Sequence, residues 1–245
     1  MKAMIFAAGL GTRLRPLTDT MPKALVPIAG KTLLEHVIQK LANAGFDELI
    51  VNIHHHGEQI VQFLKEKKNF GLRIEISDER DMLLDTGGGI KKAAHFFDDG
   101  KPFLIHNVDI LSNADLKNLY ERHCESNNLA TLLVNQRETS RYLLFDENMR
   151  LNGWQNIKTE EVKSPHDNFD PEHYKRFAFS GIHLLSPDIF KWMESWNGKF
   201  PIMDFYLDLC GKIPIGAFCD DQLKMVDVGK IETLEKAEEF VGHPM

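Results

Sequence analysis

The sequence predicts an α/β fold, a mainly parallel sheet with helices on both faces. Strand-like and helix-like segments alternate along most of the 245 residues. The strand-like segments, among them "MKAMIF", "ELIVNI" and "PFLIHN", are almost continuously apolar, as strands buried on both faces are. No repeat or low-complexity linker interrupts the alternation, so we expect a single domain over residues 1–245.

The individual elements follow from apolar spacing. Residues 32–45 place leucine, valine and isoleucine at helical intervals and end at Gly45, which predicts a helix. The same criteria predict further helices at 58–71, 88–100 and 114–128, and strands at 48–54, 72–79, 102–110, 129–136 and 177–185. "RYLLFDENMRLNGWQNI" is a predicted hairpin that turns at "DENMR", and residues 224–241 are a predicted strand, turn and helix.

One segment departs from this regular pattern. Residues 157–176 are polar, contain two prolines and show no apolar period. Loops of this length inside compact domains are commonly lids or insertions. We therefore expect residues 157–176 to form a mobile lid, because they lie between two strands that border the expected ligand-binding cleft.

Composition excludes several classes of protein. The formal net charge is −7, whereas a nucleic-acid-binding surface would bring a basic excess. No apolar run approaches the ~20 residues of a membrane span, and no signal peptide is recognisable. The three cysteines are far apart, which favours buried thiols in a reducing compartment. The expectation is a soluble cytoplasmic protein without nucleic-acid or membrane partners, either a monomer or a small homo-oligomer.

The turn after the first strand carries the strongest chemical signal. "AAGLGTRLRPLTDTMPKALVPIAG", residues 7–30, combines two glycines with Arg13, Arg15 and Lys23. Glycines allow backbone N–H groups to approach a ligand closely, and the cations indicate that this ligand is an anion. A Walker A loop is excluded by spacing, and a dinucleotide fingerprint is excluded by Leu14 and Pro16.

Two aspartates end predicted strands at the edge where such sheets bind ligands. Asp109 ends "NVD", and Asp227 lies in "VDVG". Two carboxylates beside a phosphate-binding turn suit Mg²⁺, which prefers hard oxygen ligands and takes others from phosphate and water. Turn or cap roles for the two residues stay open.

The motif residues together resemble the sugar-1-phosphate nucleotidylyltransferases. The residues that carry the resemblance are Gly9, Gly11, Thr12, Arg13, Leu14, Pro16, Thr18, Pro22, Lys23 and Pro27, followed by "LDTGGGI", Asp109, "FSGI" and "VDVG". The resemblance covers nearly the whole chain and is greatest to the short N-acetylmuramate 1-phosphate uridylyltransferase branch, which carries no β-helix. It implies a Rossmann-like fold of the nucleotide-diphospho-sugar transferase type, with a mixed, mainly parallel sheet and helices on both faces. It also implies Mg²⁺-dependent coupling of a nucleoside triphosphate to a sugar 1-phosphate with release of pyrophosphate.

The resemblance also implies roles for individual residues. Gly9, Gly11, Thr12 and Arg13 would bind the nucleotide phosphates, and Lys23 would lie near the α-phosphate and the sugar phosphate. Arg13, Lys23 and Asp109 would be catalytic, and Asp109 and Asp227 would hold the metal.

The remaining implied contacts are to the nucleoside and the sugar. Asp85, Gly87 and Gly88 would contact the nucleoside, although a glycine run can also serve only close helix packing. Asn107 and Gly181 would contact the sugar phosphate.

Departures from the family leave the substrate open. The Glu-Glu-Lys-Pro motif of many members is replaced by "GWQNIK", so Lys158, Lys175 or Arg176 is expected to replace its lysine. We expect UTP and N-acetylmuramic acid 1-phosphate as substrates. The alternatives are mannose- or heptose-1-phosphate guanylyltransferase, choline-phosphate cytidylyltransferase, and a non-catalytic regulatory subunit that senses nucleotide sugars.

Overall fold

The computed structural model describes residues 1–242. Contacts within the chain divide it into two compact units, each formed from separate stretches of sequence. Unit 1 contains Met1–Leu84, Ile105–Lys117 and the described part of Lys224–Met245, whereas unit 2 contains Asp85–Leu104 and Asn118–Leu223.

Unit 1 has a parallel sheet. Strand β1 (Lys2–Phe6) pairs with β4 (Glu48–Ile53), and β4 pairs in turn with β5 (Arg73–Asp78), all in parallel. On the other side, β1 neighbours β6 (Phe103–Asn107), whose last three residues belong to unit 1. Nearly every residue of β1 and β4 is buried, as the continuous apolar runs predict.

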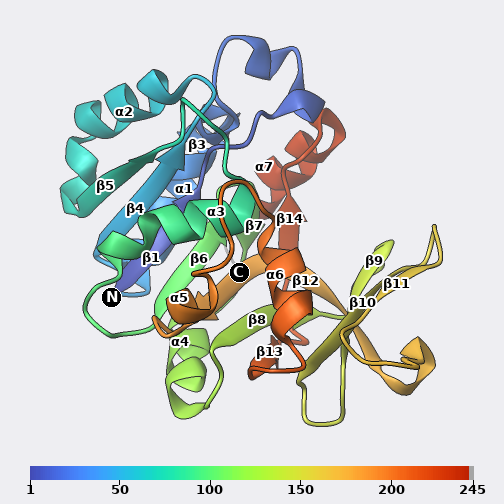
Figure 1. Ribbon diagram of the computed structural model, residues 1–245. Helices are drawn as coiled ribbons and strands as arrows, with labels where there is room; N and C mark the ends of the chain where they lie inside the picture. Colours follow the sequence, from blue (N-terminus) through green and yellow to red (C-terminus); the bar gives the residue numbers. More distant parts are fainter. Residues whose placement is uncertain (243–245) are drawn as a thin grey trace. The chain divides into compact units, whose positions relative to one another are not determined.

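Unit 1 also contains helices, which lie beside this sheet (Figure 1). Helix α1 (Leu33–Asn43) begins at Thr32, whose side chain accepts a hydrogen bond of 3.1 Å from the backbone N–H of Glu35. The apolar face of α1 is fully buried, and the predicted helix is confirmed within two residues at each end. The other elements of unit 1 are α2 (Gly57–Glu66), α7 (Leu234–Gly242), β2 (Pro27–Ile28), β3 (Lys31–Thr32), β7 (Ile110–Ser112) and β14 (Met225–Asp227).

Unit 2 has a mixed sheet. Its long strand β12 (Lys175–Leu185) is antiparallel to both β8 (Ala130–Asn135) and β9 (Arg141–Phe145). Strand β9 continues into β10 (Leu151–Asn156), which confirms the predicted hairpin. Strand β13 (Ile215–Cys219), which the apolar pattern did not predict, adds to β8 in parallel.

The core of unit 2 includes stacked aromatic rings. Phe97 and Phe103 stack at 3.7 Å between centroids, and Phe190 stacks on Phe103 at 5.6 Å. The helices connected to this unit are α3 (Asp85–Lys92), α4 (Leu116–Glu125), α5 (Ile189–Trp192) and α6 (Ile202–Leu209). No helix among residues 1–242 has the length and apolar character needed to cross a membrane.

The polar segment at 157–176 is more ordered than its sequence indicates. Glu161–Lys163 forms strand β11, which pairs antiparallel with β10, so these three residues belong to the sheet and not to a loop. Further along, the rings of Phe169 and Tyr174 stack at 4.4 Å. Backbone pairing and ring stacking stabilise the segment without any apolar period. Its action as a lid stays a prediction.

Candidate active site

In unit 1, the opening turn folds as three short 3₁₀ segments, Thr12–Leu14, Leu17–Asp19 and Lys23–Leu25. Gly11 has a positive φ of 65°, and its carbonyl accepts hydrogen bonds of 2.8 Å from Leu14 N–H and from the Thr18 hydroxyl. A Cβ at Gly11 would lie 2.8 Å from Thr18 Cγ2. Conformation and space therefore both require glycine at this position.

The turn brings Lys23 to the end of strand β6. Lys23 Nζ forms an ion pair with Asp109 Oδ2, and the two side chains are only 10% and 23% exposed. Asn107 and Asp109 are half-buried, whereas Val108 between them is buried, which is consistent with the two polar residues lying on one side of the chain.

Asp227 comes to the same place from the far end of the sequence. Strand β14 pairs antiparallel with β7, which sets Asp227 opposite Ile110. The next residue, Val228, donates its N–H to the Asp109 carbonyl at 2.8 Å. The two predicted metal ligands are thus brought together by backbone pairing.

Gly229 shows that Arg13 also belongs to this group. A Cβ at Gly229 would lie 2.8 Å from Asp227 Oδ1 and 2.9 Å from a guanidinium nitrogen of Arg13. Both side chains therefore pass directly over the Gly229 backbone. Gly229 was not among the predicted site residues, although the "VDVG" motif contains it.

The result is a cluster of two cations and two carboxylates in unit 1, with Gly9 and Thr12 exposed beside it. Within residues 1–242, no group of three or more histidine, cysteine or acidic side chains is arranged to hold a metal. Two carboxylates suit a hard cation that completes its ligand shell with phosphate and water. The donor set therefore fits Mg²⁺, and Asp109 and Asp227 are the residues that would hold it.

His106 adds no charge next to this cluster at neutral pH. Its ring is fully buried, and burial lowers the pKa of His106 to about 4. The neutral ring donates Nδ1–H to the carbonyl of Asn107 at 2.8 Å. The charge of the cluster thus comes from the arginine, the lysine and the two aspartates.

The predicted nucleoside residues begin helix α3 in unit 2. Asp85 has a positive φ of 62° and accepts the N–H of Thr86 at 2.7 Å. Gly87 and Gly88 donate their N–H groups to the carbonyl of Phe200, and a Cβ at Gly87 would lie 2.2 Å from the Phe200 ring. Close packing thus explains why Gly87 is a glycine, and contact with a nucleoside stays a prediction.

Two further features of unit 2 involve this motif and its surroundings. Thr86, which was not a predicted site residue, accepts the N–H of Ile202 at 2.8 Å and so ties the start of α6 to α3. Gly181 is buried within β12 and has a positive φ of 80°. Its predicted contact with the sugar phosphate is untested.

Unit 2 contains a pocket of about 370 Å³ beside α6, and we call it the basic pocket. Trp154 and Phe179 supply aromatic walls. Its charged lining residues are Arg137, Arg141, Lys163 and Asp204, three cations and one acid. Lys163 Nζ lies 5.4 Å from the Trp154 ring centroid and 3.8 Å from Asp204 Oδ1, while Arg137 donates to the Phe179 carbonyl at 3.1 Å.

The basic pocket does not test which residue replaces the missing family lysine. Lys158, Lys175 or Arg176 was predicted for that role, none of them lines this pocket, and their role stays a prediction. Arg176 instead forms an ion pair with Glu172. Lys163 was not among the predicted site residues, because it lies in strand β11, which the sequence did not predict.

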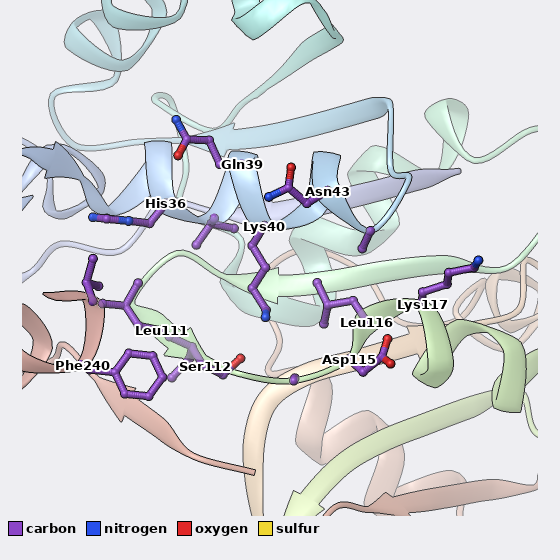
Figure 2. A pocket seen from close by; sticks show the side chains of 15 residues that line it. His36, Gln39, Lys40, Asn43, Leu111, Ser112, Asp115, Leu116, Lys117 and Phe240 are labelled. Carbon is purple, nitrogen blue, oxygen red and sulfur yellow. The ribbon is translucent and has the colours of Figure 1, made fainter. Parts of the chain in front are cut away.

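Unit 1 also contains a pocket of about 760 Å³ formed by α1, β7 with the segment after it, and the end of α7 (Figure 2). Lys40 extends from α1 into it, and burial lowers the pKa of Lys40, with Asp115 opposing that shift. None of the predicted site residues lines this pocket. The pocket therefore shares no lining residue with the charged cluster.

Comparison with known proteins shows the family to which the chain belongs. The pattern of the nucleotidyl transferase family matches residues 2–243. A UTP–glucose-1-phosphate uridylyltransferase of Synechocystis is 32% identical over 95% of this chain and 67% of its own length. An N-acetylmuramate α-1-phosphate uridylyltransferase of Caulobacter vibrioides is 46% identical over 44% of this chain and 45% of its own length.

A solved structure shares the fold across the whole chain. It is described as a glucose-1-phosphate thymidylyltransferase from Bacillus anthracis and is 18% identical, with a TM-score of 0.80 over 100% of this chain and 96% of its own. The chain belongs to the nucleotidyl transferase family. The predicted fold class and enzyme class are thereby confirmed.

Proposed function

We propose that this protein is a sugar-1-phosphate nucleotidylyltransferase whose preferred substrates are UTP and N-acetylmuramic acid 1-phosphate. The observation that carries the proposal is the convergence of Arg13, Lys23, Asp109 and Asp227 in unit 1. A reaction between two phosphate anions needs positive charge to reduce their repulsion and carboxylates to hold a divalent cation.

The two basic residues supply the charge for the transfer. Backbone N–H groups at Gly11 and Thr12, with the Arg13 guanidinium, bind the β- and γ-phosphates of the nucleotide. Lys23 lies near the α-phosphate and lowers its repulsion of the incoming sugar phosphate. The sugar phosphate is already an anion, so no general base is required.

Asp109 and Asp227 are the residues that would hold Mg²⁺. When bound, the ion neutralises negative charge that develops on the departing pyrophosphate. In the structure, Lys23 forms an ion pair with Asp109. Substrate binding would therefore redirect Lys23 from Asp109 to phosphate oxygens.

The basic pocket supports an acidic sugar substrate. Three cations against one acid leave it net positive, and the walls of Trp154 and Phe179 suit a sugar ring. N-acetylmuramic acid carries a lactyl carboxylate, which distinguishes it from glucose and mannose. Recognition of that carboxylate by Arg137, Arg141 or Lys163 would give the pocket its selectivity.

Pyrophosphate release from a matrix of substrates tests this proposal. Each of UTP, GTP, CTP and TTP is combined with N-acetylmuramic acid, N-acetylglucosamine, glucose, mannose and heptose 1-phosphates, and with phosphocholine. UTP with the acidic sugar should give the highest kcat/KM. Highest activity with GTP and mannose or heptose 1-phosphate would overturn the uridylyl proposal, and no activity with any pair would favour a regulatory role.

A further inference from the structure

Two polar side chains are buried side by side in the core of unit 1. Asn52 on β4 is 2% exposed, and Glu79, directly after β5, is 1% exposed. Asn52 Nδ2 donates to Glu79 Oε1 at 2.8 Å. Burying a carboxylate and an amide is costly unless each finds hydrogen-bond partners, so their other contacts indicate what they do.

Both side chains accept hydrogen bonds from backbone N–H groups that come directly before predicted nucleotide contacts in the sequence. Asn52 Oδ1 accepts the N–H groups of Ala7 at 2.7 Å and Ala8 at 3.2 Å, immediately before the glycines of the opening turn. Glu79 Oε2 accepts the N–H of Leu84 at 3.0 Å, immediately before Asp85. A continuous set of hydrogen bonds thus connects the start of the phosphate turn with the start of "LDTGGGI".

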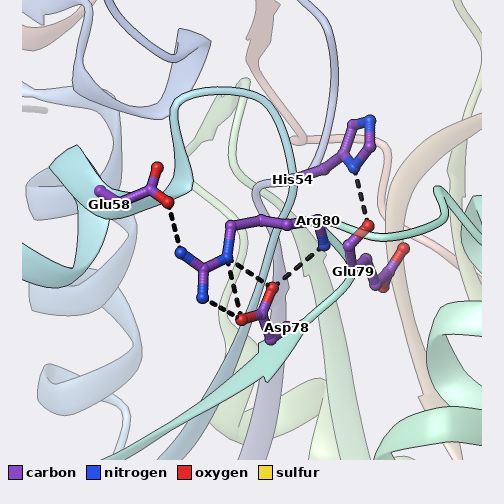
Figure 3. Close-up of polar contacts among 5 residues, drawn as sticks. All are labelled: His54, Glu58, Asp78, Glu79 and Arg80. Atoms are coloured by element: carbon purple, nitrogen blue, oxygen red, sulfur yellow. Dashed lines mark hydrogen bonds and ion pairs between the residues drawn. The ribbon is translucent and has the colours of Figure 1, made fainter.

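The backbone at Glu79 is held by other contacts, as Figure 3 shows. His54 Nδ1–H donates to the Glu79 carbonyl at 2.7 Å. Arg80 donates to Asp78 at 2.9 Å through Nε and also forms an ion pair with Glu58. A change confined to the Glu79 carboxylate would leave these contacts in place, so its effect can be assigned to the hydrogen bonds with Asn52 and Leu84.

We infer that Asn52 and Glu79 are positioning residues for nucleotide binding. They fix the two backbone segments that precede the predicted phosphate and nucleoside contacts, without touching the nucleotide themselves. This inference rests on the proposed nucleotidyl transfer. It assigns a role to two residues that lie outside the motifs on which the sequence analysis based the resemblance.

The direction of the hydrogen bonds gives the inference a sharp test. Asn52→Asp removes the donor and sets a second carboxylate against Glu79. Glu79→Gln leaves one acceptor oxygen for two donors, Asn52 Nδ2 and Leu84 N–H. In the double variant, the new glutamine amide can donate to the new aspartate, whose other oxygen still accepts from Ala7 and Ala8. The glutamine oxygen then accepts from Leu84, so every hydrogen bond is restored with the central one reversed.

The experiment measures nucleotide binding and turnover in both single variants and the double variant. UTP and GTP are each titrated by calorimetry, and nucleotide and sugar-phosphate KM values come from pyrophosphate release. Each single variant should weaken binding of the preferred nucleotide and raise its KM at least tenfold, with little change in sugar-phosphate KM. The double variant should recover most of that loss. Asn43→Asp and Glu66→Gln, at exposed positions of unit 1, are the matched controls and should behave as wild type.

Folding is checked by circular dichroism, and hydrogen exchange is measured in peptides covering residues 4–12 and 80–90. Faster exchange in both peptides in the single variants, reversed in the double variant, is the expected result. Native folding with wild-type nucleotide binding in both single variants would overturn the inference. A double variant that is no better than the singles would also overturn it. If the wild-type protein bound nucleotide but turned over no substrate pair, the result would contradict the proposed function and not this inference.

Discussion

At the scale of single residues, the charged cluster depends on how little space surrounds it. Gly11 and Gly229 each let another group pass where a methyl group would stand, Thr18 at the first and Arg13 with Asp227 at the second. Lys23 and Asp109 are mostly shielded from water, which strengthens their attraction. Small changes here should therefore act on catalysis before they act on folding.

Loss of either carboxylate should abolish most of the activity. Asp109→Asn and Asp227→Asn keep the side-chain shape but remove the charge that would hold Mg²⁺. Turnover should fall by at least ~10²-fold in each variant, because the charge that forms on pyrophosphate is no longer neutralised. Steady-state pyrophosphate release over a Mg²⁺ titration measures this, and near-normal activity in either variant would contradict the assignment.

Gly229→Ala tests the close approach of Arg13 and Asp227. The added Cβ would come within 2.9 Å of both side chains, so one of them must move. A displacement of about 1 Å at a reacting site can cost ~10²-fold, and we expect a fall in kcat of that order. Gly242→Ala is the matched control, because a Cβ there meets no atom of residues 1–242 within 4 Å. Equal activity of the two variants would show that the cluster tolerates the shift.

At the scale of elements, the long buried strands with continuous apolar runs were predictable, whereas β11 and the short strand β13 were missed. The hairpin β9–β10 was foreseen, whereas β11 was missed because Glu161–Lys163 is exposed and has no apolar alternation. Asp109 and Asp227 could be proposed as neighbours because ligand-binding residues gather at strand ends. Asn52 and Glu79 could not be proposed as neighbours from the sequence. A polar residue inside or just after an apolar strand does not indicate which distant residue it will hydrogen-bond.

The unpredicted strand β11 supplies a test of sugar selectivity. Arg141→Ala and Lys163→Met each remove a cation from the basic pocket. A hydrogen bond to a charged group contributes about 1.5–3 kcal/mol, so KM for N-acetylmuramic acid 1-phosphate should rise by roughly 10- to 100-fold in at least one variant. KM for N-acetylglucosamine 1-phosphate, which lacks the carboxylate, should change little.

The control for this selectivity test is Lys212→Met, an exposed lysine of unit 2 outside the pocket. Its kinetics with both sugars should match the wild type. If Arg141→Ala and Lys163→Met impaired both sugars equally, the pocket would bind a part that the two sugars share. The acidic group would then be recognised elsewhere.

At the scale of the whole molecule, buried histidines make stability depend on pH. Burial lowers the pKa of His106 and His123 to about 4 and that of His183 to about 3. In the unfolded chain these groups titrate near 6.5. Between these values the unfolded chain binds protons that the folded protein does not bind, so acidification favours unfolding.

The free energy of unfolding should therefore fall as the pH drops from 7 to 5, by ~2 kcal/mol for each such histidine. His183 is the best probe, since neither ring nitrogen has a hydrogen-bond partner within the described residues. His183→Phe should keep the ring packing and reduce this pH dependence. Urea unfolding at the two pH values measures it, with His95→Gln, at an exposed position, as the control. An unchanged difference in His183→Phe would contradict the assignment.

Unit 1 is assembled from three separate stretches of sequence, and this has a consequence for the synthesis of the protein. Its charged cluster draws Arg13 and Lys23 from the first stretch of sequence, Asp109 from the second and Asp227 from the third. On the ribosome, Arg13 and Lys23 emerge more than two hundred residues before Asp227. Domains tend to fold as units during translation, but this one lacks a member of its cluster until the third stretch has been made. Nascent chains that do not yet contain Asp227 should therefore be inactive. Two separately expressed fragments divided between the second and third stretches would have to reassociate to regain turnover.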